Sequence, residues 1–155
     1  MKFRVVVVGK PRAQLLAAAI QEYETRAARY WPLEVREVRE EPARGASPAI
    51  VREREGERLL AAAGAGALLV ACEDEGDART SPDLASWMSA ERERATRDVA
   101  FVIGGAYGLS PALRAQAAQR LSFSQFTLSH ELARLVLAEQ LYRAGTIVRG
   151  EPYHK

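Results

Sequence analysis

The chain contains only two histidines, and both stand where they could take part in chemistry. His154 follows Tyr153 directly in a basic tail, residues 150–155. An aromatic ring beside a histidine and basic groups could stack on a nucleic-acid base and handle a proton. A tail of this composition is, however, more often simply a disordered chain end. His130 begins a helix, where a capping or surface role is the more common one.

Arg143 is the third candidate, because it follows Tyr142 near the end of the last predicted helix. Its charge could simply complement the helix dipole. It could instead bind a phosphate or a carboxylate through two parallel hydrogen bonds. No order of nucleophile, base and acid indicates a hydrolase, and Ser110 and Ser129 are better explained as helix N-caps.

Three segments that follow predicted strands could form a ligand site: Cys72–Gly76, Ile103–Ser110 and Phe123–His130. Parallel α/β sheets bind ligands beyond the carboxyl ends of their strands, so these segments could lie along one rim. In the second segment, Gly104 and Gly105 carry no side chain and would let the backbone approach a ligand closely. Their spacing matches neither a dinucleotide-binding motif nor a P-loop. A glycine pair after a strand is more often just a tight turn.

The elements that must position these segments alternate between strand and helix. The predicted strands are Phe3–Val8, Leu33–Arg39, Ala67–Cys72, Val99–Ile103 and Leu121–Phe126. The predicted helices run from Pro11 to about Tyr30, Pro48 to Ala63, Pro82 to Thr96, onward from Ser110-Pro111, and from Ser129 to Gly145. We expect Leu33–Arg39 towards a sheet edge because of its charges, and loops at 40–47 and 73–79. This pattern predicts an α/β fold: a mostly parallel sheet with helices on both faces.

Length and composition fit one domain, residues 1–155, with 48% hydrophobic and 27% charged residues. No apolar run is long enough for a membrane span. The first residues lack a small-residue cleavage site, so no signal peptide is expected. One cysteine and no Cys/His cluster predict neither a disulfide nor a metal site. We therefore expect a cytoplasmic protein without a metal.

The net charge of +2 is too small for bulk electrostatics to indicate nucleic-acid binding. The distribution of charge says more. Residues 1–12 carry four bases and no acid, and residues 113–155 carry six bases and three acids.

Three C-terminal motifs resemble one known family: FVIGGAYGLSP (101–111), FTLSHELARLVLAEQLYRA (126–144) and EPYHK (151–155). The segments KFRVVVVGK (2–10) and GERLLAAAG (56–64) fit as well, so the likeness spans nearly the whole chain. The sequence resembles the SPOUT, or trefoil-knot, methyltransferases. It is most similar to the small bacterial members that methylate N3 of a pseudouridine in large-subunit ribosomal RNA.

The resemblance implies a homodimer with a deep trefoil knot in its last forty or so residues. It implies S-adenosyl-L-methionine as methyl donor, bound in a bent conformation and without a metal. The implied cofactor residues are Cys72, Gly104, Gly105, Phe123, Ser124, Gln125, Phe126, Thr127 and Leu128. His154 would remove or share the N3 proton, Tyr153 would stack on the flipped base, and Arg143 would anchor phosphate or substrate. The tail could complete the site of the other subunit.

The chain departs from the family pattern at three places. Cys72-Glu73 stands where the family usually has Leu-Asp, Ala106-Tyr107 where it has Pro-Glu, and Ser129 where a proline commonly precedes the histidine. The implied substrate is large-subunit ribosomal RNA, in the ribosome rather than free. Two alternatives stay open: a non-catalytic RNA- or ribosome-binding module of the same fold, and a SPOUT enzyme acting on transfer RNA.

Overall fold

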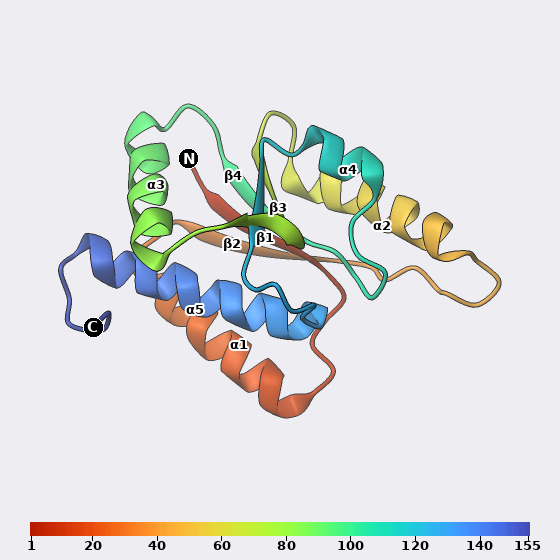
Figure 1. Ribbon diagram of the computed structural model, residues 1–155, viewed down its shortest axis with the longest axis horizontal. Helices are drawn as coiled ribbons and strands as arrows, with labels where there is room; N and C mark the ends of the chain where they lie inside the picture. The colour runs from red at the N-terminus through yellow and green to blue at the C-terminus, as the bar shows by residue number, and fades with distance from the viewer.

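Five parallel strands form one sheet at the centre of the protein, as Figure 1 shows. The structure is a computed structural model that describes residues 1–155. The strands are β1 (Phe3–Val8), β2 (Leu33–Val38), β3 (Leu68–Ala78), β4 (Val99–Ile103) and β5 (Gln119–Ser122). Their order in the sheet is β2-β1-β4-β3-β5, and every neighbouring pair is parallel. The predicted parallel sheet is confirmed, with the charged β2 at one edge as expected.

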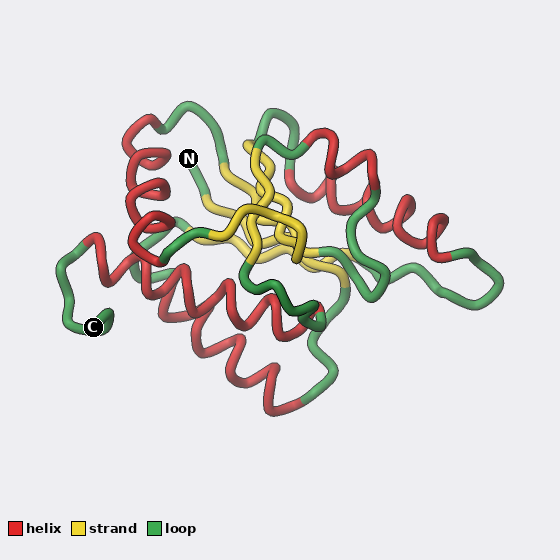
Figure 2. The backbone as a smooth tube through the Cα atoms, in the orientation of Figure 1, coloured by secondary structure: helices red, strands yellow, loops and turns green.

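Helices cover both faces of the sheet, which Figure 2 shows as red coils around the yellow strands. The helices are α1 (Gln14–Ala27), α2 (Pro48–Ala63), α3 (Ser81–Arg94), α4 (Pro111–Gln116) and α5 (His130–Val148). Because side chains alternate along a strand, Val5 and Val7 of β1 pack in the core under α1, α3 and α5. Val6 and Val8 face the second core, under α2 and α4. None of the helices combines the length and the apolar composition that a membrane span requires.

Side-chain caps fix where the helices that flank the strand ends begin. Ser110 and Ser129 are N-caps, as predicted: their hydroxyls accept hydrogen bonds from the backbone N–H of Leu113 and Leu132 at 3.2 and 3.3 Å. The N-cap of α3 is Thr80, so this helix begins at Ser81, one residue before the predicted start at Pro82. Thr80 and Asp83 form a reciprocal capping box.

Two strand boundaries differ from the prediction. The acidic stretch 73–79 was predicted as a loop, but β3 continues to Ala78, with a register shift between Cys72 and Asp77 opposite β5. The fifth strand was predicted at Leu121–Phe126, yet it ends at Ser122. Beyond it Ser124 closes a local turn, because its hydroxyl accepts a hydrogen bond from Phe126 N at 2.9 Å. The chain from 123 to 129 is therefore a loop.

The last helix is also longer than predicted. Gly145 was expected to end it, but α5 continues to Val148, and Gly150, with φ of 67°, follows the helix end. Gly145 lies instead where α5 meets α1: a Cβ there would come within 2.3 Å of the Tyr30 ring. Tyr30 lies in the turn that follows α1, so the small size of Gly145 lets this turn pack closely against α5. The trefoil knot stays a prediction.

Candidate functional site

A cavity of about 340 Å³ opens at the carboxyl ends of β4 and β5 and beside Cys72–Asp74 in the middle of β3. Its walls come from the three segments that the sequence singled out, so the expected common rim exists. A volume in this range suits a small-molecule ligand, for which roughly 300–1,000 Å³ is typical. The lining residues are Cys72, Glu73, Asp74, Ile103, Gly104, Gly105, Ala106, Tyr107, Gly108, Leu109, Arg114, Phe123, Ser124, Phe126, Thr127, Leu128, His130 and Ala133.

Of the residues that the resemblance assigned to the cofactor, only Gln125 does not line this cavity. The cavity also includes Arg114, which lies outside the segments that the sequence singled out, and Asp74 and His130, which lie within those segments but had no binding role assigned. His130 could have been found, because a residue directly after the N-cap of α5 lies at the carboxyl end of the sheet. Arg114 lies within α4, and only the packing of that helix brings it to the rim.

The two glycines of the cavity wall are required by their own loop. A Cβ on Gly104 would lie 2.5 Å from the carbonyl carbon of Gly108, and one on Gly105 would lie 2.6 Å from Glu55 Oε2. The loop is closed by a hydrogen bond from Gly108 N to Gly105 O at 3.0 Å. From the sequence, these glycines allowed either the close approach of a ligand or, more commonly, a tight turn. The structure shows a tight turn, in which protein atoms fill the space beside both glycines, so the glycines shape the wall of the cavity.

Cys72 forms part of the buried floor of the cavity and is only 7% exposed. Burial raises the pKa of its thiol well above the ordinary value. The group therefore stays protonated and packs as a small apolar side chain. With Leu128 and Phe123 it supplies apolar surface of the kind that covers the faces of a purine ring.

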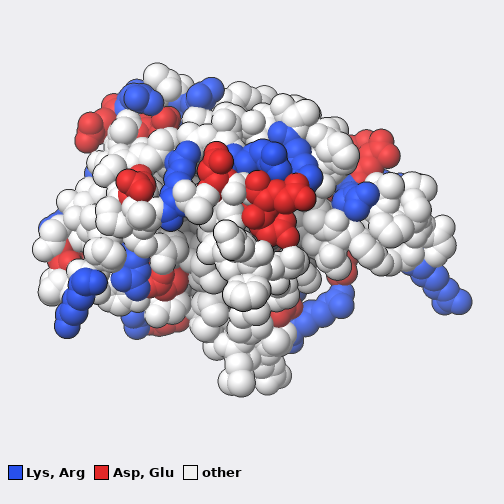
Figure 3. All heavy atoms as spheres, in the orientation of Figure 1, with Lys and Arg blue, Asp and Glu red and all other residues white.

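The rim of the cavity is polar and holds both signs of charge. Asp74 Oδ2 accepts a hydrogen bond from the Thr127 hydroxyl at 2.8 Å, which ties the middle of β3 to the loop before α5. Arg114 Nε lies 2.5 Å from Glu73 Oε2, and Arg120 pairs with the same carboxylate. Figure 3 shows acidic and basic side chains interspersed over this face. No group of three or more His, Cys, Asp or Glu side chains is arranged to hold a metal ion.

The three predicted catalytic residues lie together, but at the other end of α5. Arg143 Nη1 is 3.3 Å from His154 Nδ1, and the guanidinium lies 4.7 Å from the centre of the Tyr153 ring. Glu151 accepts a hydrogen bond from the Tyr30 hydroxyl at 2.5 Å, which fastens the tail to the end of α1. The tail is thus folded back on the helix that precedes it.

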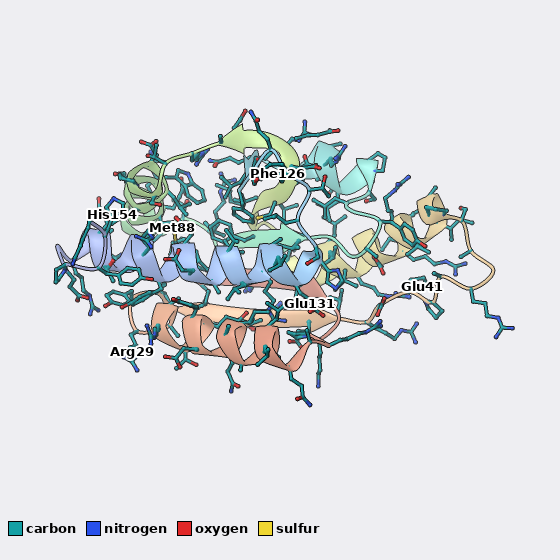
Figure 4. All side chains as sticks on the ribbon, turned by 60° about the horizontal axis from the view of Figure 1, so that its bottom comes forward. Arg29, Glu41, Met88, Phe126, Glu131 and His154 are labelled. Carbon is teal, nitrogen blue, oxygen red and sulfur yellow. The ribbon has the colours of Figure 1, made fainter.

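Within one chain, the cavity and the three predicted catalytic residues do not lie together. His130 lines the cavity at the first turn of α5, and Arg143 follows 13 residues later on the same helix. At 1.5 Å per residue this separates them by about 20 Å along the axis. Figure 4 shows the same separation: His154 lies at the end of α5 opposite Glu131 and away from Phe126.

A comparison with known families decides where this architecture belongs. A family model described as "Predicted SPOUT methyltransferase" matches residues 1–154. The chain belongs to the SPOUT methyltransferase family.

Relatives of this SPOUT family member match it over its whole length. A protein from Gemmatimonas aurantiaca named ribosomal RNA large subunit methyltransferase H is 57% identical, and the match covers all of both chains. A protein of the same name from Anaeromyxobacter dehalogenans is 48% identical over all of both chains. Among solved structures, a probable methyltransferase from Bordetella pertussis has a TM-score of 0.60 at 18% identity, covering 93% of this chain and 96% of the other. A tRNA methyltransferase from Aquifex aeolicus has a TM-score of 0.54 at 15% identity, with 100% and 75% covered.

The departures from the SPOUT pattern all lie at or beside the cavity. Cys72, Glu73, Ala106 and Tyr107 line it, and Ser129 caps the helix that begins there. Tyr107 is 43% exposed, so it lies at the mouth rather than in the floor. The glycines of the loop, Gly104, Gly105 and Gly108, are all present.

Proposed function

We propose that this chain methylates N3 of a pseudouridine in large-subunit ribosomal RNA, with S-adenosyl-L-methionine as methyl donor. The observation that carries the proposal is the end-to-end match with relatives named ribosomal RNA large subunit methyltransferase H. The cavity supports it, because the segments that the family resemblance assigns to the cofactor converge there.

The residues present fit the proposed cofactor. Backbone groups of Gly104, Gly105 and the loop 123–128 would hold the adenosyl part, with Cys72 against the ring. Asp74 offers a carboxylate for the methionyl ammonium group, and Arg114 a guanidinium for its carboxylate. When bound, the cofactor supplies an electrophilic methyl group on a sulfonium. The protein's task is to hold the attacking nitrogen in line with that methyl group.

We propose that two copies of the chain complete the site, with the tail of one copy over the cavity of the other. The separation along α5 supports this, because Arg143 and His154 of one chain lie too far from its own cavity to reach a substrate held there. Two apolar side chains are open to solvent in the single chain: Phe126, which lines the cavity, is 82% exposed, and Leu15 in the first turn of α1 is 88% exposed. Covering them in a homodimer would remove apolar surface from water.

Mixing two inactive variants tests the shared site. His154→Ala removes the imidazole of the tail, and Gly104→Leu disrupts the glycine loop that forms one wall of the cavity. In a mixed dimer one of the two composite sites contains neither change. Co-expressed with two different affinity tags and purified through both, the mixed dimer should regain about half of the wild-type activity per dimer. No recovery would place both halves of the site in one chain.

The proposed substrate is RNA within the ribosome. A net charge of +2 and mixed charges on the surface give little general attraction to phosphate. Recognition of the RNA would then depend on its shape and on local groups of basic side chains, such as those within Lys2–Arg12 and in the tail. A radiolabelled methyl-transfer assay on intact ribosomes, naked ribosomal RNA and transfer RNA tests this directly. We expect labelling of large-subunit RNA in ribosomes. Labelling of transfer RNA alone would refute the proposal.

One rival from another class is a non-catalytic ribosome-binding module of the same fold. Calorimetry separates the two, because the module would bind ribosomes without binding S-adenosyl-L-methionine. The intact glycine loop and the well-formed cavity favour the enzyme.

A further inference from the structure

We infer that Glu139 and Tyr153 are positioning residues that hold His154 with its proton on Nε2, so that His154 donates a hydrogen bond to the substrate base instead of removing its proton. The inference rests on the proposed function for its substrate. It replaces the roles that the sequence suggested for His154 and Tyr153. The geometry around Arg143 carries it.

Glu139 is the centre of this geometry. One of its oxygens, Oε1, accepts hydrogen bonds from Arg143 Nε at 3.0 Å, from Arg143 Nη2 at 2.5 Å and from the Tyr153 hydroxyl at 3.0 Å. The other oxygen accepts a hydrogen bond from Gln140 at 2.7 Å, and Gln140 in turn accepts one from Ser81 at 2.6 Å. Its carboxylate, chiefly through these hydrogen bonds, raises the pKa of Arg143. The guanidinium is thus charged and fixed in orientation.

Fixing two nitrogens of Arg143 directs the third one towards His154. Nη1 lies 3.3 Å from Nδ1 of the imidazole. A guanidinium has only N–H donors, so Nδ1 must be the acceptor of this hydrogen bond. A proton on Nδ1 would face an N–H of a cation. The neutral ring therefore carries its single proton on Nε2.

Tyr153 is half-buried, and its ring and its hydroxyl both already have partners in the protein. Its ring lies 4.6 Å from the ring of Tyr142, tilted by 57°, and 4.7 Å from the guanidinium of Arg143. Its hydroxyl is bound to Glu139. Burial, as the largest cause, raises the pKa of Tyr153, so the phenol remains a donor. Tyr153 thus anchors the residue before His154, whereas His154 itself is exposed.

An Nε2–H donor suits the chemistry at N3. This nitrogen lies between two carbonyl groups, and loss of its proton spreads negative charge onto their oxygens. A hydrogen bond from His154 to one of these oxygens would stabilise that charge. The N3 proton passes to solvent water, and the electron pair left on N3 forms the bond to the methyl carbon. The sulfur keeps the pair of the bond that breaks. His154 carries the same proton before and after.

Two substitutions of His154 separate donor from base. The side-chain amide of His154→Gln can donate from nearly the position of Nε2 but cannot take up a proton at neutral pH. We expect His154→Gln to stay within about tenfold of the wild-type turnover. His154→Ala should lose about 100-fold or more, the usual effect of removing one such donor. Equal losses in both variants would overturn the inference.

The orientation of the ring is tested without activity. With only two histidines in the chain, long-range proton–nitrogen NMR of the labelled protein at pH 8 resolves both imidazoles. We expect His154 to be protonated on Nε2 only, and its Nδ1 signal to move when Arg143→Met removes the donor. Arg149→Met is the matched control at the end of α5 and should leave this signal unchanged. A proton on Nδ1, or no response to Arg143→Met, would overturn the inference even in an active enzyme.

The role of Glu139 is tested by Glu139→Gln, with Glu91→Gln as a control. Glu91 also pairs with an arginine of its own helix, Arg94, at 2.9 Å. We expect Glu139→Gln to lower kcat at least tenfold while the affinity for S-adenosyl-L-methionine is kept, and to shift the Nδ1 signal of His154. Wild-type kcat in Glu139→Gln would refute the role. If no variant or wild-type protein methylates RNA but the NMR result holds, the proposed function fails and the positioning stands.

Discussion

Gly104→Ala is the substitution for which the structure gives the clearest consequence. The added Cβ would lie 2.5 Å from the carbonyl carbon of Gly108, 2.6 Å from its oxygen and 2.9 Å from Leu109 N. All three are backbone atoms, so no side-chain rotation relieves the overlap. The segment 105–109 must move away from β4, and this segment forms one wall of the cavity.

The size of the effect follows from the cost of overpacking, about 1–3 kcal/mol. If the loop can relax by distorting the cavity, that cost is transferred to ligand binding. It then weakens the affinity for S-adenosyl-L-methionine roughly 5- to 150-fold, at about 1.4 kcal/mol per tenfold. If the loop cannot relax, the cost appears as a lower free energy of unfolding. Titration calorimetry and thermal unfolding of the same samples measure both parts.

Gly108→Ala is the matched control, because it adds the same methyl group where no neighbouring atom overlaps with it. Gly108 has φ of 81° and no atom within 4 Å of an added Cβ, so alanine there meets backbone strain without overlap. We expect it to cost stability by about 1–2 kcal/mol and to weaken binding less than Gly104→Ala. The reasoning is refuted if Gly104→Ala binds the cofactor and unfolds as the wild type does.

Three further outcomes are expected. Gly145→Ala would place a Cβ 2.3 Å from the Tyr30 ring and push α5 from the turn that follows α1, so Tm should fall by roughly 2–4 °C for each kcal/mol lost; an unchanged Tm would contradict the packing. Cys72, whose pKa is raised by burial, should react with a thiol reagent at pH 8 far more slowly than an exposed cysteine, because the thiol stays protonated; labelling at the rate of an exposed cysteine would contradict the raised pKa. Burial also raises the pKa of Glu55, whose Oε2 has no hydrogen-bond partner. The unfolded state therefore loses this proton first, and stability declines as the pH rises from about 4 through the folded pKa. Glu55→Gln should raise Tm at pH 8 and not at pH 4; equal changes at both would contradict the charge argument.

The cores of the strands and the cavity segments could be predicted because local signals determine them, whereas the ends of β3 and β5 could not. Apolar periodicity and the caps at Ser110 and Ser129 position the glycine loop and the start of α5. The sequence of residues 73–78 contains no such local signal for the extension of β3. Its acidic residues have low strand propensity, and they pair instead with β5 and with Arg114 and Arg120.

The tail could not be predicted from local sequence at all. Its conformation depends on two contacts with distant residues: Glu151 accepts a hydrogen bond from Tyr30, and Tyr153 donates one to Glu139. The packing of α1 against α5 brings Tyr30 close to the tail. Gly145 shows the same limit. As a residue type it indicates a helix end, yet its neighbour across the helix interface requires it within the helix.

Analysis of nucleosides after the reaction tests the central claim most directly. Large-subunit RNA from ribosomes treated with the protein and S-adenosyl-L-methionine is digested, and the nucleosides are separated by chromatography with mass spectrometry. The account predicts one new nucleoside, a pseudouridine carrying the methyl group on N3, and its loss in His154→Ala. A methyl group on any other base or on a ribose, or no methylated nucleoside at all, would contradict it.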